Sequence, residues 1–108
     1  MDIISYETFK RRYKPSIWQV RDGIKGWAIQ TVTPTLQHHG WKVCEQEFDY
    51  RLCLDEKPKH MAQRLVLEQW GEEWTKDKKF VYYLYKGTNG YMDVLYVYWK
   101  YKHENDVI

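Results

Sequence analysis

The stretch Phe80–Lys102, FVYYLYKGTNGYMDVLYVYWKYK, decides the fold of this chain. Its two hydrophobic halves are joined by Gly87-Thr88-Asn89-Gly90, and Asn-Gly supplies the positive φ angles that a hairpin turn requires. We therefore predict two antiparallel strands, at 80–86 and 91–102. Apolar residues occupy both the odd and the even positions of the second strand. This pattern predicts a central strand that is covered on both faces.

A helix that could cover one of these faces is predicted from Pro58 to about Trp74. Large apolar residues recur there at helical spacing, and Gly71 is a position at which the helix could end early. The residues of the expected core-facing side are Ala62, Val66, Trp70 and Trp74, with Met61, Leu65 and Leu67 beside them.

A second, shorter helix is predicted to begin after Ser5, which is a favourable N-cap residue. Ile4 and Phe9 take the two positions of a hydrophobic staple. Basic residues gather toward the end of this helix, where they complement the helix dipole, and Pro15 ends it. These basic residues are Lys10, Arg11, Arg12 and Lys14.

Residues 17–32 permit two interpretations. Apolar residues fit a helical period, but Asp22-Gly23 is a hairpin turn signal and the flanking residues prefer strands. We favour the hairpin. The next segment predicts a short helix that starts at Thr33-Pro34 and ends before Gly40.

Residues 41–54 alternate between apolar and charged side chains, which predicts one long strand with one face in water. Cys44 and Cys53 would then point to opposite faces, too far apart for a disulfide. Free thiols are typical of a reducing compartment. Together with the absence of a signal-peptide pattern at Met1, this predicts a cytoplasmic protein.

These elements predict an α+β fold. Its mainly antiparallel sheet of four to five strands carries one long packed helix and a short N-terminal helix. The 108 residues suffice for a single domain, 1–108, with residues 103–108 as a frayed tail. Net charge is +2, which by itself does not imply a polyanionic partner.

The chemistry-bearing residues follow no catalytic or phosphate-binding motif. His38, His39 and Cys44 could ligate a metal together with Cys53 or His60, but the spacing is unlike that of structural zinc sites. Carboxylates at Glu45, Glu47 and Asp49 could act as an acid–base pair, and are equally expected on a solvated strand face. We therefore predict no metal and no cofactor, and the absence of catalytic motifs argues against an enzyme without excluding one.

Aromatic residues make up 18% of the chain, and nine fall within Phe80–Tyr101. Tyrosine and tryptophan are enriched at interfaces. The sequence therefore predicts a non-catalytic protein-binding module, of the adaptor or inhibitor type, that self-associates as a dimer through the hairpin because one helix covers one sheet face. The candidate binding residues are Tyr83, Tyr85, Tyr91, Tyr96, Tyr98 and Trp99.

Two alternatives remain open from the sequence. The first is single-stranded nucleic-acid binding, in which Lys10, Arg11, Arg12 and Lys14 neutralise phosphates beside exposed aromatic rings. The second is a small-ligand binder or enzyme with a pocket lined by tyrosine and tryptophan and the carboxylates of 45–49 at its mouth.

Overall fold

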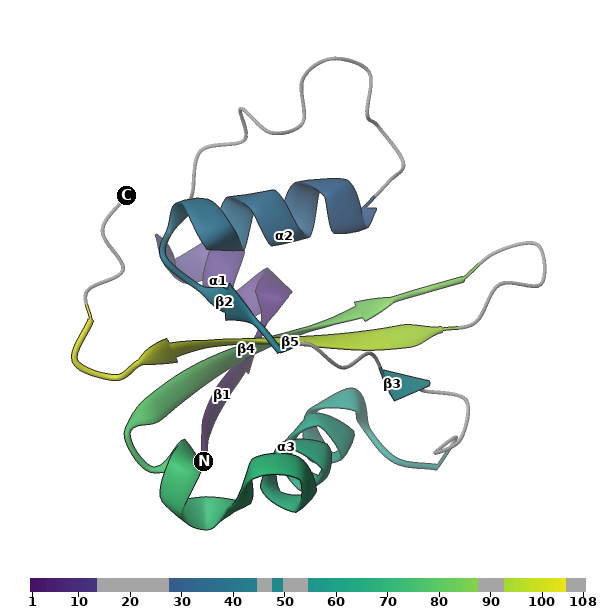
Figure 1. The fold of residues 1–108 in the computed structure, drawn as a ribbon. Coiled ribbons are helices and arrows are strands. Elements are labelled where there is room, and N and C mark those ends of the chain that lie inside the picture. The colour runs from purple at the N-terminus through teal and green to yellow at the C-terminus, as the bar shows by residue number, and fades with distance from the viewer. Residues whose placement is uncertain (14–27, 45–47, 50–54, 88–92, 105–108) are drawn as a thin grey trace.

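The computed structural model of the chain describes residues 1–13, 28–44, 48–49, 55–87 and 93–104. Five strands form one sheet in the order β1-β4-β5-β2, and β3 also pairs with β5. Helices α1 and α2 lie on one side of the sheet and α3 on the other (Figure 1). The predicted α+β class, the mainly antiparallel sheet and the two predicted helices are confirmed. The elements are β1 (Asp2–Ser5), α1 (Tyr6–Tyr13), α2 (Ala28–His38), β2 (Lys42–Val43), β3 (Phe48–Asp49), α3 (Pro58–Thr75), β4 (Lys78–Tyr85) and β5 (Val94–Tyr101).

The predicted hairpin forms the centre of the sheet. Strands β4 and β5 pair antiparallel along their whole length, from Lys78 opposite Tyr101 to Tyr85 opposite Val94. Strand β1 pairs with the outer side of β4, while β2 and β3 pair with the outer side of β5. The turn residues 88–92 lie outside the described residues, so the predicted Asn89-Gly90 turn stays a prediction.

Both faces of β5 are buried, as the sequence predicted. The odd positions Leu95 and Val97 belong to the core under α3, and the even positions Tyr96 and Tyr98 belong to the core under α1 and α2. The α3 core is built around Ile3, Cys44, Met61, Ala62, Val66, Phe80, Leu95 and Val97. The opposite core contains Tyr6, Phe9, Val32, Leu36, Trp41, Val81 and Tyr98.

Helix α1 begins as predicted, because the Ser5 hydroxyl accepts a hydrogen bond from the Thr8 backbone N–H at 3.1 Å. Strand β1, immediately before it, was not predicted. Its four residues run parallel to β4 and place Ile3 opposite Phe80 in the α3 core. A strand this short shows too few alternations for its period to be recognised.

Helix α2 corrects two predictions. Residues 28–32 are helical rather than part of a hairpin, and Pro34 lies inside the helix rather than at its start. Residues 17–27 lie outside the described residues. A proline inside a helix costs about 3 kcal/mol, and here the burial of Val32 and Leu36 against the sheet offsets that cost.

The end of α2 is confirmed at Gly40, which has a φ of +88°. The Gly40 N–H bonds the Gln37 carbonyl and the Trp41 N–H bonds the Leu36 carbonyl, which together make a Schellman motif. Trp41 and Leu36 also share the buried core on this side of the sheet. The motif thereby turns the chain from α2 into β2.

The long strand predicted at 41–54 is described only as β2 and β3, since 45–47 and 50–54 lie outside the described residues. Their registers differ: Val43 faces Tyr98, whereas Phe48 faces Leu95. From Val43 to Phe48 the chain advances five positions, whereas their partners on β5, Tyr98 and Leu95, are three positions apart. Because the difference of two is even, Cys44 and Phe48 stay on the same face of the sheet. The prediction of a water-exposed second face is wrong at β2, because Trp41 and Val43 pack beneath α1 and α2.

None of the helices in the described part of the chain has the length and hydrophobicity needed to cross a bilayer. His103 and Glu104, the start of the predicted frayed tail, contact the sheet. The His103 ring lies 5.6 Å from that of Tyr101, and the Glu104 carbonyl accepts a hydrogen bond from Lys79. Residues 105–108 lie outside the described part.

Candidate functional site

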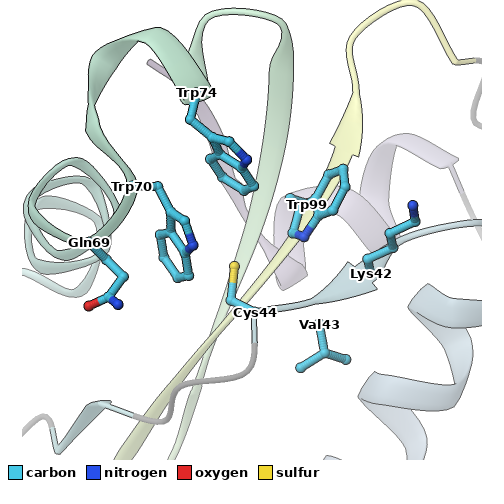
Figure 2. Close-up of a pocket in the computed structure, with 7 residues that line it drawn as sticks. All are labelled: Lys42, Val43, Cys44, Gln69, Trp70, Trp74 and Trp99. Atoms are coloured by element: carbon cyan, nitrogen blue, oxygen red, sulfur yellow. The ribbon is translucent and has the colours of Figure 1, made fainter.

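A pocket of about 410 Å³ opens between the C-terminal part of α3 and the strands β2 and β5. Three half-buried indole rings surround it, Trp70 and Trp74 from α3 and Trp99 from β5. Figure 2 shows the sulfur of Cys44 between these rings, at the base of the pocket. The remaining lining residues are Lys42, Val43 and Gln69.

The strand register explains why Trp99 and Lys42 meet at the pocket. Lys42 on β2 is directly opposite Trp99 on β5, and Trp99 is directly opposite Phe80 on β4. Directly paired residues point to the same face of a sheet. All three side chains therefore project toward α3.

A kink at Gly71 shapes the helical wall of the pocket. Gly71 has φ 82° and ψ 166°, in a region essentially restricted to glycine, and it divides α3 between Trp70 and Trp74. The two indoles stack with centroids 5.3 Å apart, and Trp74 meets Trp99 edge-on at 5.4 Å. The last turn of the helix therefore folds Trp74 over the sheet.

The buried ammonium group of Lys78 contacts the rings of Trp74 and Trp99. Its side chain is 6% exposed, and Nζ donates to the Trp74 carbonyl at 2.9 Å and to an Asp77 carboxylate oxygen at 3.1 Å. The same Nζ lies 4.1 Å from the centroid of Trp74 and 5.5 Å from that of Trp99. Such cation–π contacts strengthen when the cation is desolvated.

The two reactive groups at the pocket differ in character. Lys42 is exposed, and its Nζ lies 4.7 Å from the centroid of Trp99. Cys44 is buried, and burial raises the pKa of its thiol to about 12. Because the thiolate is the nucleophile, this thiol is suited to packing rather than to attack.

Four of the predicted partner-binding residues share the sheet face that carries α1 and α2, where Tyr83 lies directly opposite Tyr96, but Trp99 lies on the other face. Tyr98 is fully buried, and its hydroxyl shares a 2.6 Å hydrogen bond with Thr33. Tyr83, Tyr85 and Tyr96 are half-buried, and Tyr83 packs edge-on against Tyr6 of α1. Trp99 lines the pocket, whereas Tyr91 lies outside the described residues.

The predicted nucleic-acid residues Lys10, Arg11 and Arg12 are exposed on α1, and Lys14 lies outside the described residues. The aromatic residues of this helix turn inward, with Phe9 fully buried. The basic cluster also lies on the opposite side of the sheet from α3 and its tryptophans (Figure 1). The structure therefore does not combine these cations with the rings of Trp70, Trp74 and Trp99.

The candidate metal and carboxylate residues do not converge either. In the part of the chain that the structure describes, no three His, Cys, Asp or Glu side chains form a group that could hold a metal ion. His39 and Cys44 are buried in different cores, and His60 is exposed near the start of α3. Asp49 is half-buried, while Glu45, Glu47 and Cys53 lie outside the described residues.

Of the tryptophans at the pocket, only Trp99 was predicted from the sequence as a binding candidate, whereas Trp70 and Trp74 were placed in the core. Sequence reasoning also missed Lys42, Gln69 and Lys78. The sequence held one signal for Lys42: in the alternating pattern of 41–54 it occupies an even position, which puts it on the same strand face as Cys44 and Phe48. Lys78 lies two residues before Phe80, and residues two apart on a strand point to the same face. That spacing could have placed Lys78 on the face that α3 covers. Gln69 had no signal beyond adjacency to Trp70.

Comparison of the chain with protein-family models, with curated proteins and with solved structures finds no match.

Proposed function

We propose that this chain is a non-catalytic binding module whose tryptophan pocket receives an aromatic or large aliphatic side chain of a protein partner. The observation that carries the proposal is the half-exposed cluster of Trp70, Trp74 and Trp99 around one pocket. Tryptophan is among the residues most enriched at binding hot spots. The volume of about 410 Å³ lies within the 300–1,000 Å³ typical of ligand pockets, so a large side chain can enter it.

Preorganisation supports the same proposal. The stacked pair on α3, the Gly71 kink and the buried Lys78 ammonium fix the rings before a ligand arrives. Binding then orders fewer side chains, which lowers its entropic cost. The protonated Cys44 thiol at the base favours a packing role over nucleophilic chemistry.

Our proposal does not include self-association through the hairpin faces. The predicted self-association required an uncovered second sheet face, and Phe9, Val32 and Leu36 cover that face from α1 and α2. The module proposed here therefore uses the pocket rather than the flat sheet.

Selection from a displayed random-peptide library tests the proposal. Peptides selected on the wild-type protein should share an aromatic or large aliphatic residue and should lose at least about tenfold in affinity toward Trp70→Ala, as truncation of a hot spot predicts. Arg11→Glu, on the other side of the sheet, is the matched control and should bind normally. Peptides that bind Trp70→Ala as tightly as wild type would refute the assignment of this pocket.

A further inference from the structure

We propose that the partner segment is acidic: its aromatic or aliphatic side chain enters the tryptophan pocket while a carboxylate one or two residues away pairs with Lys42. This inference rests on the proposed function and adds the charge of the ligand to it. Its basis is the placement of two lysine ammonium groups around the same indole rings.

The first step is the exclusion of cations. Tryptophan-lined pockets are well suited to ammonium ligands, because the ring faces attract positive charge. Here Lys78 already lies 4.1 Å from the Trp74 centroid, and Lys42 lies 4.7 Å from the Trp99 centroid. An incoming cation would find these ring faces already occupied by ammonium groups. It would also meet the charge of Lys42 at close range, whereas the charge of Lys78 is paired with Asp77.

The second step concerns the charge that is left for a ligand. Lys42 is the one charged side chain among the described residues that line the pocket. It is exposed and forms no ion pair with any residue that the structure describes. The contact with Trp99 holds its ammonium beside the ring, so a carboxylate could pair with it at little additional cost in side-chain entropy.

Geometry sets the spacing between the anchor and the carboxylate. One or two residues of extended chain span about 3.5–7 Å. The separation of 4.7 Å between Lys42 Nζ and the Trp99 centroid falls within this span. An aspartate or glutamate beside the anchor residue can therefore reach Lys42 while the anchor contacts the indoles.

The mixed charges of the α3 surface favour a peptide over a nucleic acid. Glu68, Glu72 and Glu73 are exposed on the same part of the helix as Trp70 and Trp74. Arg64 pairs with Glu68 and Lys76 pairs with Glu73, so this surface carries balanced charges rather than a run of cations. A phosphodiester chain needs a run of cations along its path. It would meet these carboxylates on one side of the pocket, whereas a single ligand carboxylate on the β2 side meets only Lys42.

Three blocked pentapeptides test the charge of the ligand. Each has a central phenylalanine, flanked by two aspartates, two asparagines or two lysines. Binding is followed by NMR through the indole N–H signals of Trp70, Trp74 and Trp99. We expect the aspartate peptide to bind about 1.4- to fivefold more tightly than the asparagine peptide, the range measured for an exposed ion pair, and the lysine peptide to bind most weakly. Added salt should reduce these differences.

The Lys42→Met variant keeps most of the unbranched side chain and removes the terminal ammonium group with its charge. It should bind the asparagine peptide as wild type does and lose the preference for aspartate. Lys10→Met is the matched control, because Lys10 also lies over an aromatic ring, that of Tyr6, but on the opposite side of the sheet. It should keep the preference.

The outcomes separate the two proposals. If wild type binds the three peptides with equal affinity, the proposal of an acidic partner segment is wrong, but the pocket remains a binding site. If no peptide shifts the three indole signals, the proposed function itself fails. If a short oligothymidylate shifts them and the peptides do not, the partner is a nucleic acid and both proposals are wrong.

Discussion

At the scale of single residues, Lys78 is the residue on which the tryptophan cluster depends most directly. Its ammonium contacts the rings of Trp74 and Trp99 and bonds the Trp74 carbonyl. Lys78→Met should therefore lower the free energy of unfolding by about 1–3 kcal/mol, because a backbone carbonyl and three rings, the third being that of Tyr101, lose their charged partner. Urea unfolding followed by circular dichroism measures this change.

Lys76→Met is the control for this variant, because Lys76 is exposed and pairs with Glu73, which is also exposed. It should change stability by less than about 0.5 kcal/mol. Equal effects of the two substitutions would mean that the desolvation of the Lys78 ammonium cancels its contacts with the rings.

At the scale of the elements, Gly71 gives helix α3 the shape that the pocket needs. A Cβ at this position would meet no atom within 4 Å, so the cost of Gly71→Ala comes from backbone strain alone. Adopting the φ and ψ of Gly71 costs another residue about 1–3 kcal/mol. The denaturant midpoint should fall accordingly, or the helix should straighten and move Trp74 away from Trp99.

The exposed Leu67, in the same helix, provides the comparison. Leu67→Ala should leave both the midpoint and the indole NMR signals nearly unchanged. A Gly71→Ala protein with wild-type stability and unchanged Trp74 and Trp99 signals would contradict the importance of the kink.

The elements also show how far the sequence could predict this fold. Helix α3 and the hairpin were predictable because their apolar periods are long. Strand β1 was too short for its pattern to be recognised. Helix α2 was mispredicted because Pro34 and the β-branched residues favour other local structure, and the burial of Val32 and Leu36 outweighs that preference.

The candidate site was predictable only in part. The spacing of Trp70 and Trp74 identified the face of α3 that meets the sheet. The pairing of Lys42 with Trp99 follows from a strand register that the sequence does not specify. The burial of Lys78 depends on tertiary packing around a charged residue, and lysine is almost never fully buried.

At the scale of the whole molecule, buried ionisable groups make stability depend on pH in the alkaline range. Burial raises the pKa of Cys44 from 9.0 to about 12, and it raises the pKa of Tyr98, Tyr6 and Tyr83 above 10.0. The folded protein thus keeps protons that the unfolded chain loses above about pH 9. Unfolding then releases protons, so the free energy of unfolding falls as pH rises.

Urea midpoints measured between pH 7 and 11 test this dependence. The midpoint should be nearly constant up to about pH 8.5 and should fall above it. Cys44→Ala should flatten the first part of the decline, although its midpoint is lower at every pH because a buried side chain is lost. A midpoint that rises between pH 9 and 11 would contradict the assigned direction of these pKa changes.

The covering of both sheet faces also determines the expected oligomeric state. Helices α1 and α2 bury one face of the hairpin and α3 buries the other. Among the described residues, Met1 and Leu67 are the large hydrophobic side chains left exposed, and two such residues do not make an extended apolar patch. A stable dimer buries about 800 Å² on each partner. We therefore expect a monomer.

Sedimentation equilibrium at micromolar concentration measures this directly, and a single species of 13.3 kDa is the expected result. The Leu67→Lys variant should have the same mass, because no interface depends on that side chain. A species of twice the mass would show that another surface associates, and loss of that species in Leu67→Lys would place the interface on α3. If wild type and variant are both dimers, the outer edge of β1, which pairs on one side with β4, becomes the surface to test next.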